Sequence, residues 1–436
     1  MHELFLIVAS VGSLYYLLGK RGFDYFSLAF FSADVYFLPG FFGYVSYGVN
    51  GAWTNSVIYP ETYGIMIAVM LSILLATWCS ARIKPLWGPG VTIRAMNATA
   101  GFLLLFAGAG FVGVLATAGH ELLQPNKAVV LENLGRWDIL FYSAASIGFP
   151  VALSLNRRAL SAAFLALLLL DIFIGFRSAF AIALLSAMTL YLHRQGVGRL
   201  AKRNWRLGLL ALAIGFFLFA YAYFAFAVKS GSWDLLRSLS TSPESYIFLF
   251  THSEPFVIQE TLNEVIAYRF KTDIADLVSS IANLFTVFAP ELGARAVGFN
   301  DLFQRALFPE VDYGMANNIW AQMWSAGGWP LMLAFLVIYN LVLALGNRTL
   351  AIRNVVVRAG LAPLFVYWAF YIHRNDLGYA LNLEKRSFLV LAAAIAMASL
   401  AHAASGNRKK STLRSASPPT NDVTPSHGAP DYRAPD

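Results

Sequence analysis

The stretch LGLLALAIGFFLFAYAYFAFAV, residues 207–228, decides the fold class. It contains no charged residue and is bounded by Arg206 and Lys229. A run of this length and apolarity matches the roughly 20 residues that a helix needs to cross about 30 Å of hydrocarbon. We therefore expect a transmembrane helix here, with the bilayer as the solvent of the protein.

The rest of the chain has the composition of a membrane protein. Of its 436 residues, 58% are hydrophobic and 13% are charged, and the mean hydropathy is +0.59. Similar apolar runs recur along most of the chain without the alternation that is typical of barrel strands. They predict an all-α fold with about eleven transmembrane helices, placed near 4–19, 25–48, 63–81, 95–118, 138–155, 159–176, 178–192, 207–228, 319–346, 359–373 and 387–404.

The basic residues predict the orientation of these helices. If the N-terminus lies outside, every short loop rich in Lys and Arg falls on the cytoplasmic side, as the positive-inside rule requires. The formal net charge of +8 is explained in this way, so no nucleic-acid partner is expected. The single cysteine, Cys79, excludes an intramolecular disulfide.

The predicted spans divide the chain into four parts. An N-terminal bundle of about eight spans covers 1–228, a large periplasmic loop covers 229–318, and about three more spans cover 319–404. The tail, 405–436, is rich in Ser and Pro and lacks apolar residues to bury, so we expect it to be disordered in the cytoplasm. Within the loop, apolar residues from Ile274 to Phe288 recur at helical spacing, which indicates an amphipathic helix.

Three arginines lie on the non-cytoplasmic side, where the positive-inside rule does not explain them: Arg177, Arg374 and Arg386. An arginine at membrane depth costs about 2.5 kcal/mol or more, and its planar guanidinium suits the bidentate binding of phosphate. A lipid diphosphate in the outer leaflet is therefore the expected ligand. The alternatives are an interfacial anchor for Arg177 and contact with lipid headgroups for Arg386.

Other polar residues near span ends are candidates for chemistry. His373 places a titratable imidazole beside the permanent cation of Arg374, which suits a general base, although a buried, hydrogen-bonded histidine is the more common case. Asn317 and Asn318 could bind sugar hydroxyls or form an ordinary N-cap. Gly327-Gly328 could break the ninth helix or form a packing notch.

Two carboxylates, Asp34 and Asp171, fall within predicted spans. Ionisable residues at membrane depth are functional candidates because burying them without a partner is expensive. They would suit a proton relay or a carrier of an anionic or lipid-linked solute. A local hydrogen-bond donor explains each of them equally well.

The layout resembles the bacterial O-antigen polymerase and oligosaccharide repeat-unit polymerase family, together with the related O-antigen ligases. Four features carry this resemblance, and they cover most of residues 140–390. They are Gly175-Phe176-Arg177-Ser178-Ala179 between two short spans, the long loop 229–318, Met315-Ala316-Asn317-Asn318-Ile319-Trp320 leading into Gly327-Gly328-Trp329-Pro330, and His373-Arg374-Asn375-Asp376.

The resemblance implies a metal-independent glycosyltransferase without a cofactor. Such an enzyme joins undecaprenyl-diphosphate-linked oligosaccharides into O-antigen, capsule or exopolysaccharide at the periplasmic face of the bacterial inner membrane. Its expected partners are membrane lipids, a chain-length regulator and a flippase.

By the same resemblance, Arg177 and Arg374 would hold the donor diphosphate and His373 would act as the base, with His252 and Glu254 as rivals for that role. Substrate contacts are expected from Arg386, Asn317, Asn318 and His252. His252 is the only histidine within 229–318, which favours a polymerase over a ligase. A carrier and a non-catalytic scaffold stay open as alternatives.

Overall fold

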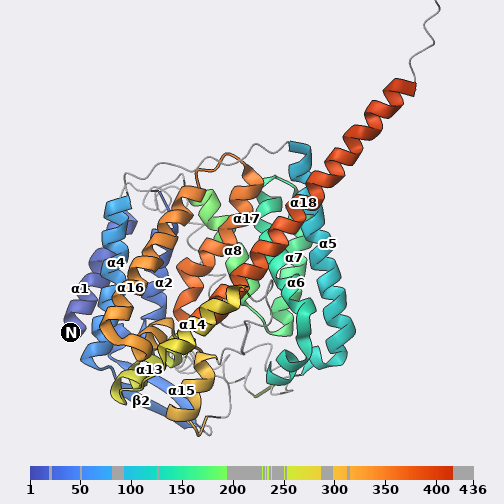
Figure 1. Ribbon diagram of the computed structural model, residues 1–436. Helices are drawn as coiled ribbons and strands as arrows, with labels where there is room; N and C mark the ends of the chain where they lie inside the picture. Colours follow the sequence, from blue (N-terminus) through green and yellow to red (C-terminus); the bar gives the residue numbers. More distant parts are fainter. Residues whose placement is uncertain are drawn as a thin grey trace, which may run out of the picture.

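A computed structural model shows a mostly helical protein whose helices stand side by side in a bundle (Figure 1). The structure describes residues 1–18, 22–49, 52–80, 93–124, 127–193, 228, 231, 233, 234, 237, 250, 253–285, 298–311 and 315–415. In this part of the chain, six helices are long and apolar enough to cross a membrane, and two shorter apolar helices, His2–Leu18 and Ser178–Leu192, accompany them. The chain is therefore a multi-pass membrane protein.

The N-terminal half is helical where the sequence predicted most of its spans. Its helices are α1 (His2–Leu18), α2 (Tyr25–Tyr36), α3 (Pro39–Phe42), α4 (Pro60–Ser80), α5 (Ile93–Ala118), the 3-10 turn η1 (Gly119–Leu123), α6 (Lys127–Ser154), α7 (Arg158–Ile174) and α8 (Ser178–Leu192). The predicted span at 207–228 lies outside the described residues, apart from its last position. The total of eleven spans and the four-part division stay predictions.

The predicted span at 25–48 is wrong. Helix α2 ends at Tyr36, and after α3 the chain forms an antiparallel hairpin of β1 (Tyr44–Val49) and β2 (Ala52–Val57). The residues between the strands are Asn50-Gly51, a pair favoured in two-residue hairpin turns because both members tolerate positive φ. The fold is thus mostly helical rather than all-α. Pro39 and Gly43, which has φ 83°, interrupt the stretch, so it does not continue as one spanning helix.

In the described part of the C-terminal half, the helices of the segment before residue 319 are followed by the apolar helices that end the chain. The elements are α13 (Glu254–Ala267), α14 (Ile274–Ala282) with the 3-10 turn η2 (Asn283–Phe285), α15 (Phe299–Leu307), α16 (Ile319–Thr349), α17 (Val355–Val366), the short π-helix η4 (Tyr367–Tyr371), the 3-10 turn η5 (Ile372–Arg374) and α18 (Leu377–Ser415). The helix expected from Ile274 to Phe288 is present as α14 and η2 as far as Phe285, and its last three positions lie outside the described residues. Helix α18 extends to Ser415, and residues 416–436 lie outside the described part of the chain, so the expected disorder of the tail stays a prediction.

Helix α16 is broken near its start, at Gly328. The backbone of this residue has φ 61° and ψ −151°, a region of the Ramachandran plot that is essentially limited to glycine. Pro330 follows two residues later and cannot donate a backbone hydrogen bond. The Gly327-Gly328 pair therefore breaks the helix, which was one of the two possibilities left open by the sequence.

The buried side chains form two main clusters. One contains residues of α1, α2, α4 and α16, including Phe30 and Tyr339, together with residues of α13. The other contains residues of α5, α6, α7, α8, α17 and α18, including Phe141 and Phe164. The bundle thus has two packed halves, and α8 lies in the second with α17.

The two ends of the bundle carry different elements. The hairpin, α13, α14 and α15 gather at the end that also carries the N-terminus, whereas α18 leaves the bundle at the opposite end (Figure 1). At that opposite end, the Asn347 side chain donates to Asp24 Oδ2 across 3.2 Å and accepts from the Tyr25 amide across 2.8 Å. The described helices of the segment 229–318 and the N-terminus thus share one end of the bundle; the side of the membrane on which this end lies stays a prediction.

Candidate functional site

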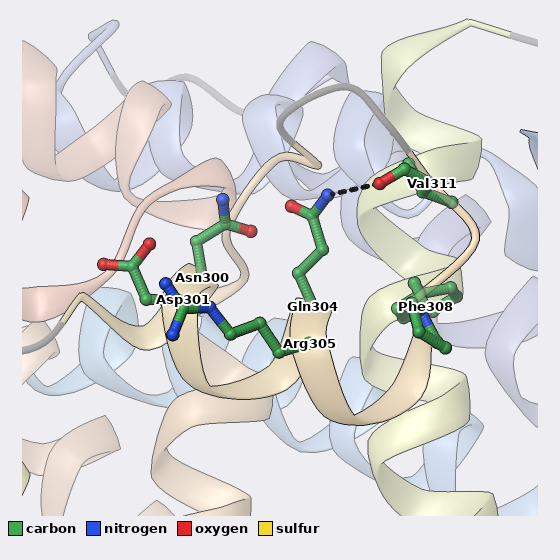
Figure 2. A pocket seen from close by; sticks show the side chains of 7 residues that line it. Asn300, Asp301, Gln304, Arg305, Phe308 and Val311 are labelled. Atoms are coloured by element: carbon green, nitrogen blue, oxygen red, sulfur yellow. Dashed lines mark hydrogen bonds between the residues drawn. The ribbon is translucent and has the colours of Figure 1, made fainter.

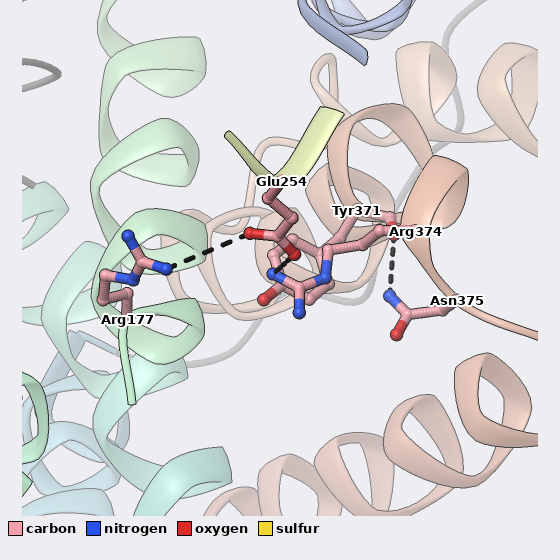
Figure 3. A network of polar contacts seen from close by, with 5 residues as sticks. All are labelled: Arg177, Glu254, Tyr371, Arg374 and Asn375. Atoms are coloured by element: carbon pink, nitrogen blue, oxygen red, sulfur yellow. Dashed lines mark hydrogen bonds and ion pairs between the residues drawn. The ribbon is translucent and has the colours of Figure 1, made fainter. Parts of the chain in front are cut away.

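Arg177 and Arg374, far apart in the sequence, meet around one carboxylate (Figure 3). Glu254 forms an ion pair with Arg374, and its second oxygen lies 4.0 Å from the Arg177 guanidinium. The three side chains are part-exposed, at 41% for Arg177, 31% for Glu254 and 26% for Arg374. Two cations and one anion leave an excess positive charge on side chains that are part-exposed.

Arg177 is positioned by a short turn between α7 and α8. Gly175, with φ 124°, ends α7, and the amides of Gly175 and Phe176 both donate to the Asp171 carbonyl. Helix α8 begins at Ser178, so Arg177 occupies its N-cap position. The guanidinium therefore lies beside the positive end of a helix dipole, which strengthens the attraction for an anion.

Arg374 is positioned by an irregular helix end. The chain leaves α17 through the short π-helix η4, and π-helix is a rare conformation found often at functional sites. Asn375 Nδ2 donates to the Tyr371 carbonyl across 2.7 Å, and the guanidinium of Arg374 lies 4.8 Å from the centre of the Tyr371 ring. The tyrosine face attracts the cation and limits its movement.

Glu254 is the first residue of α13, and the rest of that helix is firmly held. Oδ1 of Asn263, a residue of α13, accepts hydrogen bonds from the Tyr59 amide across 2.9 Å and from the Thr62 hydroxyl across 3.0 Å. Asn318 donates to the Ile258 carbonyl across 3.0 Å. Helix α13 therefore carries Glu254 to the arginines from the segment that precedes α16.

His373 does not take part in this cluster, although it is the neighbour of Arg374 in sequence. Its ring is fully buried among the aromatic rings of Tyr36, Phe37 and Trp320, and its Nδ1 accepts a hydrogen bond from Trp320 Nε1 across 3.1 Å. The predicted role as catalytic base is therefore not supported. A base must reach the proton that it removes, and this imidazole is closed off from solvent.

The two asparagines before α16 have different environments. Asn318 is fully buried, and its side chain accepts from the amides of Trp320 and Ala321, so it is the N-cap of α16. Its predicted role in substrate binding is replaced by this structural one. Asn317 is half-buried and donates to Asp376 Oδ2 across 3.0 Å. Asp376 in turn accepts from the Tyr379 amide and caps α18.

The remaining predicted site residues do not join the cluster. Arg386 is exposed in the third turn of α18, not in a loop as the sequence suggested. His252 lies outside the described residues. Asp34 accepts a hydrogen bond from Ser13 across 2.6 Å, and the Asp171 side chain is almost fully buried. Asp34 thus has the local hydrogen-bond donor that the sequence left open as an explanation.

A cavity of about 370 Å³ lies against α15 and is lined by polar side chains, including Asn300, Asp301 and Arg305 (Figure 2). Gln304 crosses it to donate to the Val311 carbonyl and to accept from the Met315 amide, which fastens the segment after α15. None of the cluster residues lines this cavity. It is a feature of α15 and the residues after it, and it is separate from the site formed by Arg177, Glu254 and Arg374.

Metal ligands are not grouped in the residues that the structure describes: no three His, Cys, Asp or Glu side chains there could together hold an ion.

No family model, no characterised protein and no solved structure matches the chain. The arrangement of the side chains must therefore carry any functional conclusion.

The contact of Glu254 with both arginines is the feature that sequence reasoning missed. Glu254 was considered only as a rival base, because nothing in its spacing from residue 177 or residue 374 indicates proximity. It precedes a proline at the start of a helix, which is a common sequence pattern. We will call Arg177, Glu254 and Arg374 the arginine cluster.

Proposed function

We propose that this protein is a membrane glycosyltransferase that polymerises undecaprenyl-diphosphate-linked oligosaccharide repeat units into O-antigen, capsule or exopolysaccharide. The arginine cluster is the observation that carries this proposal. It brings together the two arginines that the family resemblance implies for the donor diphosphate, although 197 positions of the sequence separate them (374 − 177). The proposed location is the periplasmic face of the bacterial inner membrane.

The chemistry of the cluster suits the departure of a diphosphate. When a glycosyl group is transferred, negative charge develops on the diphosphate oxygens that leave, and fixed cations stabilise that charge without reorganising. Guanidinium groups bind such oxygens in a bidentate manner. Two arginines from separate helix ends could therefore bind both phosphates of one donor.

The surroundings of the cluster suit a lipid-linked donor. Arg374 closes a segment, Val355–Arg374, that is long and apolar enough to cross a membrane, and Arg177 precedes the apolar helix α8. A donor whose polyprenyl chain lies in the bilayer would present its diphosphate at this level. Membrane lipids, a flippase and a chain-length regulator belong to the same proposal as partners, and no cofactor or metal is required by it.

The test replaces each arginine with alanine in a strain that depends on this chain for its polysaccharide. We expect Arg177→Ala and Arg374→Ala to lower chain extension by about 100-fold, the usual effect of removing a donor that stabilises developing charge. Single lipid-linked repeat units should accumulate. Arg305→Ala, which removes an exposed arginine of α15, is the matched control and should leave extension unchanged.

Normal long-chain polysaccharide from both cluster variants, at unchanged protein levels, would overturn the proposal. The same experiment separates the polymerase from its nearest alternative, an O-antigen ligase. A polymerase variant leaves single repeat units on the acceptor, whereas a ligase variant leaves full-length polymer on the polyprenyl carrier. The second pattern would assign the cluster to ligation.

A further inference from the structure

The position of Glu254 is unusual for a group at an anion site. Its carboxylate lies between Arg177 and Arg374, in contact with the second. This is the place that a diphosphate would occupy if the same arginines bound it. One anion of this chain therefore stands where the proposed substrate anion must bind.

The proposed reaction also needs a base that the predicted residue does not supply. A sugar hydroxyl attacks readily only if a nearby group accepts its proton. His373 is fully buried and its Nδ1 is engaged by Trp320. Glu254, by contrast, has a side chain that is part-exposed.

We infer that Glu254 occupies the diphosphate site while that site is empty and, once the donor displaces it, accepts the proton of the acceptor hydroxyl. This inference rests on the proposed function and assigns Glu254 as a catalytic residue within it. It explains why a carboxylate lies in a site for anions, which would otherwise only weaken substrate binding.

The exchange is favourable because the donor carries more charge than the carboxylate. A carboxylate carries one negative charge. A diphosphate carries at least one on each of its two phosphate groups, and it offers more acceptor oxygens to the two guanidinium groups. Ion pairs that are partly exposed, as these are, contribute little stability. Breaking them costs less than the two arginines gain from the diphosphate.

Glu254 stays close to the reacting atoms after it is displaced. It lies in the first turn of α13, and that helix is fixed further along by Asn263 and by the bond from Asn318 to Ile258. A change of side-chain rotamer is then sufficient to move the carboxylate off the guanidinium groups. The carboxylate then turns toward the anomeric carbon, where it can reach the acceptor hydroxyl that approaches from the side opposite to the leaving diphosphate.

The proposed step balances as follows in atoms and charge. The acceptor hydroxyl oxygen forms a bond to the anomeric carbon of the donor sugar, and its proton passes to the Glu254 carboxylate. The bond between that carbon and the diphosphate oxygen breaks, and its electron pair remains on polyprenyl diphosphate. Arg177 and Arg374 bind the released charge, and Glu254 loses its proton to water when the product leaves.

The experiment measures binding and turnover separately in the full-length protein, with Glu254→Gln as the variant and inorganic pyrophosphate as the probe. The neutral amide no longer competes for the arginines. Pyrophosphate binding, followed by titration calorimetry, should become about two- to fivefold tighter. Turnover with lipid-linked repeat units should fall by about 100-fold or more, because the proton acceptor is lost.

The matched control is Glu61→Gln, which alters an exposed carboxylate at the start of α4 and should change neither quantity. Glu254→Asp keeps the base on a shorter side chain, so it should retain part of the turnover that Glu254→Gln loses. Melting temperatures of both variants check that the fold is intact, and Glu254→Asp carries the test if Glu254→Gln does not fold.

Each contrary result overturns the inference. Unchanged or weaker pyrophosphate binding in Glu254→Gln would show that the carboxylate does not compete for the site. Tighter binding with full turnover would show that it is not the base. The proposed function fails by a different pattern, in which wild-type protein does not bind pyrophosphate and the arginine variants keep full turnover.

Discussion

Trp320 Nε1 donates a hydrogen bond to Nδ1 of His373 across 3.1 Å, and both side chains are fully buried. The bond joins the start of α16 to the irregular helix end that presents Arg374. Because Nδ1 accepts this hydrogen bond, the proton of the neutral imidazole is on Nε2. His373 therefore fixes the position of its neighbour and is not a free base.

Trp320→Phe should lower stability more than turnover. The phenyl ring leaves His373 Nδ1 buried without a donor, which costs about 1–3 kcal/mol. Thermal unfolding in detergent should show a lower melting temperature, whereas the rate per folded molecule should change by less than about twofold. A large loss of turnover at unchanged melting temperature would instead indicate a catalytic role for this pair. Trp329→Phe, at a part-exposed tryptophan, is the control.

Gly328→Ala should destabilise the protein, although space for a methyl group exists. The nearest atom to an added Cβ is Pro330 Cδ at 4.0 Å, so the cost comes from the backbone, which has φ 61°. A non-glycine residue in this conformation costs about 1–3 kcal/mol. Gly101→Ala is the matched comparison, since Gly101 lies in the regular helix α5 with nothing within 4 Å, and it should be neutral or stabilising.

Comparing the melting temperatures of the two glycine variants checks this prediction. A decrease for Gly328→Ala and none for Gly101→Ala is expected. Equal effects would mean that the break in α16 adapts to an ordinary residue, and that its backbone is not fixed by the surrounding structure.

The stability of α13 against the hairpin should depend on pH through Glu260. Burial, with a further contribution from the charge of Glu264 one turn away, raises the pKa of Glu260 from its ordinary value of 4.5 to about 8. The folded state thus binds a proton that the unfolded state releases. The resulting stability is fully present below about pH 4.5 and is lost as the pH rises through about 8.

Melting temperatures between pH 5 and pH 9 measure this effect, and we expect a decrease of a few degrees toward high pH. Glu260→Gln should weaken this dependence, because the amide can still accept the hydrogen bond from the Ser56 hydroxyl and cannot ionise. Glu61→Gln should keep the wild-type dependence. An identical pH profile for wild type and Glu260→Gln would contradict the assignment.

The two asparagines should respond differently to alanine. Asn318→Ala removes the N-cap of α16 and the bond to Ile258, so it should cost about 1–2 kcal/mol in the free energy of unfolding. Asn317→Ala removes one half-buried bond to Asp376 and should cost about 1 kcal/mol or less. Denaturant titration of both variants tests this order, and a reversed order would contradict the cap assignment.

Lysine should not restore the function of either arginine in the arginine cluster. It keeps the positive charge but cannot bind two oxygens in a fork, and it loses the stacking that Tyr371 offers to Arg374. We expect Arg177→Lys and Arg374→Lys to lower the rate of chain extension by about tenfold or more. Initial rates over a range of donor concentrations measure this, and wild-type rates would show that charge alone is sufficient.

The sequence by itself determined the class of protein and the position of most helices. Apolar runs such as 63–81 and 95–118 are helical in the structure as α4 and α5, because a backbone in hydrocarbon must satisfy its own hydrogen bonds. It also indicated Arg177 and Arg374, since a cation at the end of an apolar span needs an explanation. The sequence pair Asn50-Gly51 was also a local signal for the hairpin of β1 and β2, but the apolar content of the stretch favoured the prediction of a span.

Only the tertiary structure decided which of the candidate residues meet. Glu254 lies beside both arginines, and His373 is enclosed by Trp320 and Tyr36, yet neither fact follows from local spacing. Periodicity and hydropathy describe how a segment relates to its solvent. Which segments touch depends on the packing of helices that are distant in sequence, and that packing brings Glu254 to the arginines and encloses His373.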